Sequence, residues 1–271
     1  AIYHFQRVRN SRKYDDYIPF YITQIYFAKG EYENLLKYAE PLANDSKLRK
    51  LTEINQLIGQ AYYEIGDYEK ALPYFDYFAS RSNSFRPEDY YQLGFVYYQN
   101  GQYEKAVDEF EKLNQVDSKL GQNAMYNLGD AYLNLDDKAS ARNAFAQAAR
   151  MKYDKEVQQE ANFYYGKLSY ELNFDREALT ALLKIKPDHR NYRESQNLLS
   201  ELFLKSRDYV NAISTLETMP KRTAKLDETY QKVLYLRGLQ LYGEGQMDDA
   251  REYFEEALAN SYSIQTDALA H

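Results

Sequence analysis

Side chains that commonly perform catalysis or bind metal ions are few and far apart in this sequence of 271 residues. The three histidines are His4, His189 and His271, and cysteine is absent. A zinc site needs several such ligands on one face, as in the motif H-E-x-x-H, so the sequence predicts no metal centre. The absence of cysteine also excludes a thiol nucleophile and a disulfide framework.

Carboxylate pairs, another common source of chemistry, occur at Asp15-Asp16, Asp136-Asp137 and Asp248-Asp249. Each pair falls at an expected turn or helix start, where acids interact favourably with the helix dipole. Neither a glycine-rich phosphate loop nor a G-x-S-x-G nucleophile motif is present. We therefore expect a protein that is not an enzyme and that needs no cofactor.

Two basic clusters are present, one between Arg7 and Lys13 and one between Lys221 and Lys225. Neither alternates with aromatic residues, and the formal net charge is -7. A phosphate backbone is therefore not an expected partner. No apolar run approaches the roughly 20 residues of a membrane-spanning helix, so we expect no membrane span.

The elements that must position any site are predicted to be helices. The stretch from Leu57 to Ala79 contains two amphipathic segments of helical period on either side of a Gly66-Asp67 turn. This pattern predicts a helical hairpin. The hairpin recurs, with turn residues 34 to 38 positions apart, at Gly30, Gly66, Gly101, Asp136, Asn173, Arg207 and Gly245.

Small residues form columns in this repeat. Glycine recurs in the first helices, where it allows the paired helix to approach closely, and alanine does the same in the second helices. Large apolar residues such as Phe75 and Phe110 then fill the space toward the next hairpin. The glycine column holds Gly59, Gly94, Gly129, Gly166 and Gly238.

The period and the columns resemble those of the tetratricopeptide-repeat family over essentially the whole chain. The resemblance implies an all-α fold, a right-handed α-solenoid of antiparallel helix-turn-helix hairpins, as a single solenoid over 1–271. We expect 1–13 to be the second helix of a truncated repeat, 14–262 to form about seven hairpins, and 263–271 to begin a further truncated helix. The chain is thus interpreted as a fragment of a longer repeat protein.

In solenoids of this family the first helices line a concave groove. Two positions seven residues apart on each first helix face it, and aromatic residues dominate both. Acids such as Glu53, Glu64, Glu88 and Glu160 flank them. The candidate groove residues are Phe20, Phe27, Tyr63, Tyr91, Phe95, Tyr98, Tyr126, Asp130, Phe163, Tyr170, Tyr235 and Tyr242.

Two interpretations of these aromatics stay open, because repeats of this family often carry tyrosine at the same positions for packing alone. If the groove is functional, we expect a protein–protein interaction scaffold that binds a basic or aromatic peptide or partner protein. The alternative is a structural spacer that positions other domains of a larger envelope assembly or secretion protein. Chaperone-tail binding is not expected, because Gln24, Gln56 and Gln60 stand where that activity needs lysine and asparagine.

Two further expectations concern the context of the chain. The tyrosine- and asparagine-rich composition without cysteine is similar to that of repeat proteins of bacterial cell envelopes, so a periplasmic location is favoured over the cytoplasm. The apolar residues Ile2, Phe5 and Val8 would lack a helical partner. End-to-end self-association is therefore expected in concentrated solution.

Overall fold

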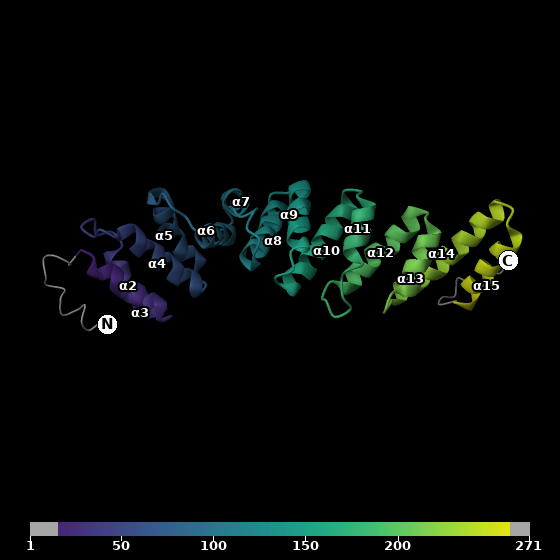
Figure 1. The fold of residues 1–271 in the computed structure, drawn as a ribbon, viewed down its shortest axis with the longest axis horizontal. Coiled ribbons are helices and arrows are strands. Elements are labelled where there is room, and N and C mark those ends of the chain that lie inside the picture. The colour runs from purple at the N-terminus through teal and green to yellow at the C-terminus, as the bar shows by residue number, and fades with distance from the viewer. Residues whose placement is uncertain (1–15, 261–271) are drawn as a thin grey trace. The chain divides into compact units, whose positions relative to one another are not determined.

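The computed structural model describes residues 16–260, and all regular secondary structure within them is helical (Figure 1). The described chain divides into two compact units, unit 1 ending at Asp137 and unit 2 beginning at Lys138. Unit 1 contains α2 (Ile18–Ala28), α3 (Tyr32–Ala39), the 3₁₀ turn η1 (Glu40–Leu42), α4 (Leu51–Glu64), α5 (Tyr68–Arg81), α6 (Pro87–Gln99), α7 (Tyr103–Glu111) and α8 (Lys119–Asn134). Unit 2 contains α9 (Lys138–Arg150), α10 (Lys155–Glu171), α11 (Asp175–Leu182), α12 (Tyr192–Ser206), α13 (Tyr209–Thr218), α14 (Ala224–Gly243) and α15 (Met247–Ala259).

Successive helices pack as hairpins within each unit. In unit 1, α2 pairs with α3, α4 with α5 and α6 with α7, and in unit 2 the pairs are α10 with α11, α12 with α13 and α14 with α15. The first helices also contact one another, α2 with α4 and α4 with α6, as do α10 with α12 and α12 with α14. The predicted all-α fold of helical hairpins is confirmed. The predicted end segments 1–13 and 263–271 lie outside the described residues.

Each hairpin turn passes through the left-handed region of the backbone. The seven turn residues marked in the sequence all have positive φ, from 55° at Arg207 to 83° at Gly245. Glycine adopts this conformation without strain, whereas Asp136, Asn173 and Arg207 adopt it at a cost. In two hairpins an aspartate directly after the turn caps the second helix: Asp67 accepts a hydrogen bond from the backbone N–H of Lys70, and Asp208 accepts one from that of Asn211.

In the hairpins that carry a glycine in the first helix, the close contact between the two helices leaves no room for a Cβ. A Cβ added at Gly94 would lie 2.9 Å from the ring of Phe110, and one at Gly238 would lie 2.6 Å from the ring of Phe254. In the hairpin of α10 and α11, Leu182 replaces the phenylalanine and would lie 2.7 Å from a Cβ at Gly166. Leucine therefore fills the same place against the first helix.

Tyrosine hydroxyls connect neighbouring hairpins in unit 1. Tyr62 donates to Glu40, and one repeat later Tyr97 donates to Asp76 over 2.7 Å. Tyr132 repeats the contact with Glu111 over 2.5 Å. Burial, together with the carboxylate beside each hydroxyl, raises the pKa of all three tyrosines. These rings thus belong to the packing of the stack.

Among the helices of residues 16–260, none combines the length and the apolar character needed to cross a bilayer.

The strain at the turn of α12 generates a stability prediction. Replacement of Arg207 by glycine is expected to stabilise the protein by about 0.5–1 kcal/mol, because glycine removes the cost of the left-handed conformation. The matched control is Arg251→Gly in the middle of α15, which is expected to destabilise by about the same amount through lost helix propensity. Urea unfolding followed by circular dichroism measures both, and destabilisation by Arg207→Gly would contradict the assignment of strain.

Candidate functional site

A groove of about 920 Å³ lies along the first helices of unit 1. Its walls come from α2, α4 and α6 and from the end of α5 with the loop that follows it. Its volume is within the range of clefts that bind ligands. The lining residues are Phe20, Gln24, Phe27, Ala28, Thr52, Glu53, Gln56, Leu57, Gln60, Glu64, Phe78, Arg81, Ser82, Ser84, Arg86, Glu88, Asp89 and Gln92.

The helical period explains why these side chains share one surface. Phe20, Gln24 and Phe27 are spaced by four and three residues and therefore lie on one face of α2. Gln56 and Gln60 have the same relation on α4. Two of the predicted candidates, Phe20 and Phe27, therefore line the groove, and both are half-buried.

Polar pairs between neighbouring first helices form part of the lining. The Gln56 Nε2 donates to the Asp89 Oδ1 over 2.8 Å, and the Gln60 Nε2 donates to the Gln92 Oε1 over 2.9 Å. Asp89 is only 3% exposed and also accepts from the Arg86 guanidinium over 2.9 Å. Because these bonds join α4 to α6 side chain by side chain, they set the spacing of the two helices in the groove.

The charges on the groove are mixed rather than uniformly acidic. Glu53 pairs with Lys50 at 2.5 Å, and Asp89 is neutralised by Arg86. Glu64 and Glu88 are exposed on the lining. Arg81, also exposed, stacks its guanidinium 3.9 Å above the centre of the Tyr77 ring. The acids that remain available to a partner are therefore Glu64 and Glu88.

Four other predicted candidates pack against one another in unit 1. The ring of Phe95 is the centre of this cluster, with its centroid 5.8 Å from that of Tyr63, 6.2 Å from that of Tyr91 and 6.4 Å from that of Tyr98. All four residues are half-buried. Ring separations of this size stabilise aromatic pairs, so the cluster contributes to packing between α4 and α6.

Two hydroxyl groups of this cluster also form hydrogen bonds. Tyr98 donates to the carboxylate of Asp130, another predicted candidate, and the Asn127 Nδ2 donates to the Tyr91 hydroxyl over 3.2 Å. Burial, strengthened by the hydrogen bond to Asp130, raises the pKa of Tyr98, and burial raises that of Tyr91. Tyr126 is half-buried on α8.

In unit 2 the predicted candidates are dispersed. Tyr170 donates to Glu201, Tyr235 lies 5.6 Å from the ring of Phe254, and Tyr242 is 59% exposed. Phe163 does not lie on a surface open to a partner: it is 2% exposed and belongs to a core cluster with Ile185 and Leu199.

A loop of nine residues, 183–191, explains why Phe163 is buried. Ile185 in this loop packs into the same core as Phe163. The loop also covers Glu160, which the sequence placed among the flanking acids and which is 7% exposed. Arg190 Nε lies 2.6 Å from the Glu160 carboxylate, and His189 Nε2 lies 3.2 Å from it. Along the repeat, Glu160 occupies the position of Glu88, which is exposed. The loop that corresponds to 183–191 in that hairpin, 112–118 between α7 and α8, is two residues shorter.

Two groups of residues were not predicted from the sequence. Arg81, Arg86 and the serines of loop 82–86 line the groove, and nothing in the periodic pattern marks them, because loops do not follow it. The group of Glu156, Glu160 and His189 brings its ligand atoms within 4.8 Å of one another. Two glutamates at i and i+4 with a histidine about one repeat later were the available signal.

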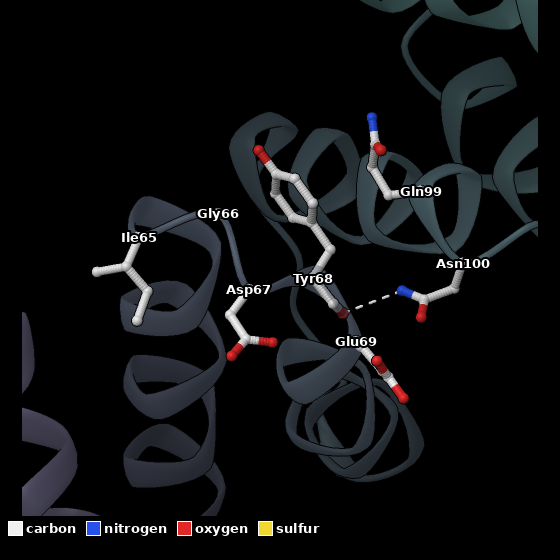
Figure 2. Close-up of a pocket in the computed structure, with 7 residues that line it drawn as sticks. All are labelled: Ile65, Gly66, Asp67, Tyr68, Glu69, Gln99 and Asn100. Atoms are coloured by element: carbon white, nitrogen blue, oxygen red, sulfur yellow. Dashed lines mark hydrogen bonds between the residues drawn. The ribbon is translucent and has the colours of Figure 1, made fainter.

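A second hollow, of about 570 Å³, lies at a hairpin turn and is shown in Figure 2. It runs from Ile65 to Glu69 and includes Gln99 and Asn100 of the next hairpin. The Asn100 side chain donates to the Tyr68 carbonyl over 3.0 Å (Figure 2). The Asp67 side chain caps α5. The polar groups of this hollow therefore hold the helices in place and connect neighbouring hairpins.

Three segments of the chain match models of the tetratricopeptide repeat: residues 52–76, 87–119 and 122–155. They coincide with the hairpin period and with α4 to α9. The chain contains tetratricopeptide repeats. Repeats of this family generally serve as non-enzymatic scaffolds for protein–protein interaction. A search of curated protein sequences found no match to this tetratricopeptide-repeat protein.

Solved structures agree with this fold. The crystal structure of YrrB, a tetratricopeptide-repeat protein with an unusual peptide-binding site, aligns with a TM-score of 0.55 at 19% identity, covering 76% of this chain and 99% of YrrB. A structure of MamA from AMB-1 aligns with a TM-score of 0.51 at 16% identity, covering 62% of this chain and 88% of MamA. At sequence identities this low, the similarity establishes a shared fold and nothing further.

The Tyr98–Asp130 hydrogen bond generates a prediction about alkaline stability. Because folding raises the pKa of Tyr98 above its ordinary 10.0, its contribution is complete below pH 10 and is lost as the pH rises through the folded pKa. Tyr98→Phe should cost about 1 kcal/mol at pH 7 through loss of the hydrogen bond to the carboxylate. The variant should also lose less stability above pH 10 than the wild type. Urea titrations at pH 7 and at alkaline pH test this, and equal alkaline losses in both proteins would contradict it.

Proposed function

We propose that this tetratricopeptide-repeat protein binds an extended peptide segment of a partner protein in the groove of unit 1. The observation that carries the proposal is the groove itself, about 920 Å³ along three consecutive first helices. YrrB, which has a similar fold, is a tetratricopeptide-repeat protein with a peptide-binding site. The fold is thus compatible with peptide binding.

The chemistry of the lining supports a peptide as the occupant. Phe20, Phe27 and Leu57 offer apolar surface for side chains. Glutamines line the groove between them, and each amide has both donor and acceptor atoms, as an extended main chain requires. Of these, Gln24 is exposed on α2. A partner segment with spaced apolar or aromatic residues fits such a surface.

The exposed acids favour a basic partner. Glu64 lies at the last residue of α4 and Glu88 near the first residue of α6, so the two acids are placed toward opposite ends of neighbouring helices. Lysine or arginine side chains beside the apolar anchors would meet these carboxylates. Such complementarity mainly sets specificity and the rate of association.

A structural spacer is the second candidate function. The contacts among Tyr63, Tyr91, Phe95 and Tyr98 favour it, because these aromatics already pack against one another. In a spacer, the stack sets the distance between other domains, and the groove stays empty.

The cellular location and the self-association stay proposals. Composition alone supports a bacterial envelope location, and the residues expected to mediate end-to-end contact lie outside the described part of the chain.

A binding experiment separates the two functions. The full chain is used to select from a displayed library of random dodecapeptides, and the tightest selected peptide is titrated by calorimetry. We expect selected peptides to combine aromatic or apolar residues with lysine or arginine. The double variant Glu64→Lys/Glu88→Lys is expected to weaken binding of the selected peptide by at least about tenfold, because it reverses the two charges.

The matched control is Glu104→Lys, which reverses an exposed acid on α7 outside the groove lining. It should leave the affinity unchanged. Selection of no peptide above background would count against peptide binding and favour the spacer. A selected peptide that tolerates the groove variant would bind elsewhere and would overturn this assignment of the groove.

A further inference from the structure

A cluster of three potential metal ligands lies in unit 2, apart from the groove. Glu156 and Glu160 project from the first turns of α10, and His189 comes from the loop between α11 and α12. One ligand atom from each residue lies within 4.8 Å of the other two. The three residues therefore meet although His189 is 29 positions from Glu160 in the sequence.

His189 is the member of the cluster that packing does not explain. Its side chain is 3% exposed, and its Nε2 makes no hydrogen bond. Burying a polar nitrogen without a partner is energetically unfavourable. The Nε2 faces the Glu160 carboxylate, 3.2 Å from Oε1, without the alignment of a hydrogen bond. A ligand between the two atoms would give the Nε2 a partner.

We propose that His189, Glu160 and Glu156 bind a divalent transition-metal ion, with Zn²⁺ the best fit. In a tetrahedral zinc site with bonds of about 2.0–2.2 Å, neighbouring ligand atoms are about 3.4 Å apart. The His189–Glu160 separation of 3.2 Å already matches this value. Glu156 is exposed and one helical turn before Glu160, so its side chain can rotate to become the third ligand. Water would take the fourth position.

Two neighbours determine how tightly the ion binds. The Asn191 Nδ2 donates to the Glu160 Oε2 over 3.3 Å and so orients the carboxylate from outside, as partners of metal ligands commonly do. Arg190 competes, because its Nε lies 2.6 Å from the Oε1 that would bind the metal. The Arg190 side chain is 67% exposed, so it can turn to solvent when the ion arrives.

The proton of the imidazole adds a second cost. The His189 Nδ1 accepts from the Asn191 backbone N–H over 3.3 Å, which places the proton of the neutral ring on Nε2. Binding of the metal at Nε2 moves that proton to Nδ1 and breaks this long hydrogen bond. The affinity should therefore be micromolar rather than that of a structural zinc finger, and the Asn191 amide should change its environment on binding.

The experiment titrates ZnCl₂ into the metal-free full chain by calorimetry and follows the backbone amides by NMR. We expect one ion per chain, a micromolar dissociation constant and a shifted Asn191 amide resonance. Glu156→Gln should weaken binding by at least about tenfold, and His189→Gln should abolish it. Because Glu156 is exposed, its variant should fold normally and keeps the test valid if His189→Gln does not fold.

The matched control is the double variant His4→Gln/His271→Gln, which removes the other two imidazoles and should bind zinc as the wild type does. The chain has no cysteine, so no thiol competes for the ion. No binding up to about 1 mM ZnCl₂ would overturn the proposal. A dissociation constant above that concentration corresponds to a binding free energy weaker than about 4 kcal/mol. Unchanged zinc binding in Glu156→Gln would also overturn the proposal, because it would indicate an adventitious ion only.

Discussion

The contact between a glycine on most of the first helices and a large apolar side chain on the second determines much of the rest of the structure. Where Phe75, Phe110, Leu182 or Phe254 lies against Gly59, Gly94, Gly166 or Gly238, a Cβ would come within 2.6–3.1 Å of the neighbouring side chain. This close approach joins the two helices of a hairpin, and a hairpin has too little core to be stable alone. The first helices of neighbouring hairpins then lie within side-chain reach of each other. The pairs Gln56–Asp89 and Gln60–Gln92 in the groove follow from that spacing.

The same spacing accounts for many of the 30 tyrosines. A tyrosine fills apolar space with its ring and still extends a hydroxyl to the next hairpin, as Tyr97 does to Asp76. Phenylalanine would leave that carboxylate without its donor, and a shorter polar residue would not fill the space. In α10 a serine stands at this position, and the Ser169 Oγ accepts from Arg142 Nε over 2.9 Å instead. Tyrosine abundance is therefore in large part a consequence of packing, and by itself it does not indicate a binding surface.

The repeat made most of the fold predictable from the sequence. The turn residues predicted by spacing all adopt positive φ, including Asp136, Asn173 and Arg207, which no glycine rule would have selected. The candidate site was less predictable. Phe20 and Phe27 line the groove, but Phe163 occupies the equivalent place to Phe20 in the repeat and is buried. Helical spacing specifies the direction of a side chain, whereas loops, which have no period, decide what covers it.

The loop of residues 183–191 shows how a repeat protein acquires chemistry that its consensus lacks. Glu88 and Glu160 occupy the same position in the repeat, yet the longer loop brings a histidine and an arginine onto Glu160 alone. The consensus positions must satisfy packing in every hairpin, so they cannot vary freely. A loop contributes little to the close contact of helices, so its length and sequence can change without loss of the stack. A group such as Glu156, Glu160 and His189 can therefore form where the repeat pattern is weakest, and in chains of this kind the departures from the period are the places to search for function.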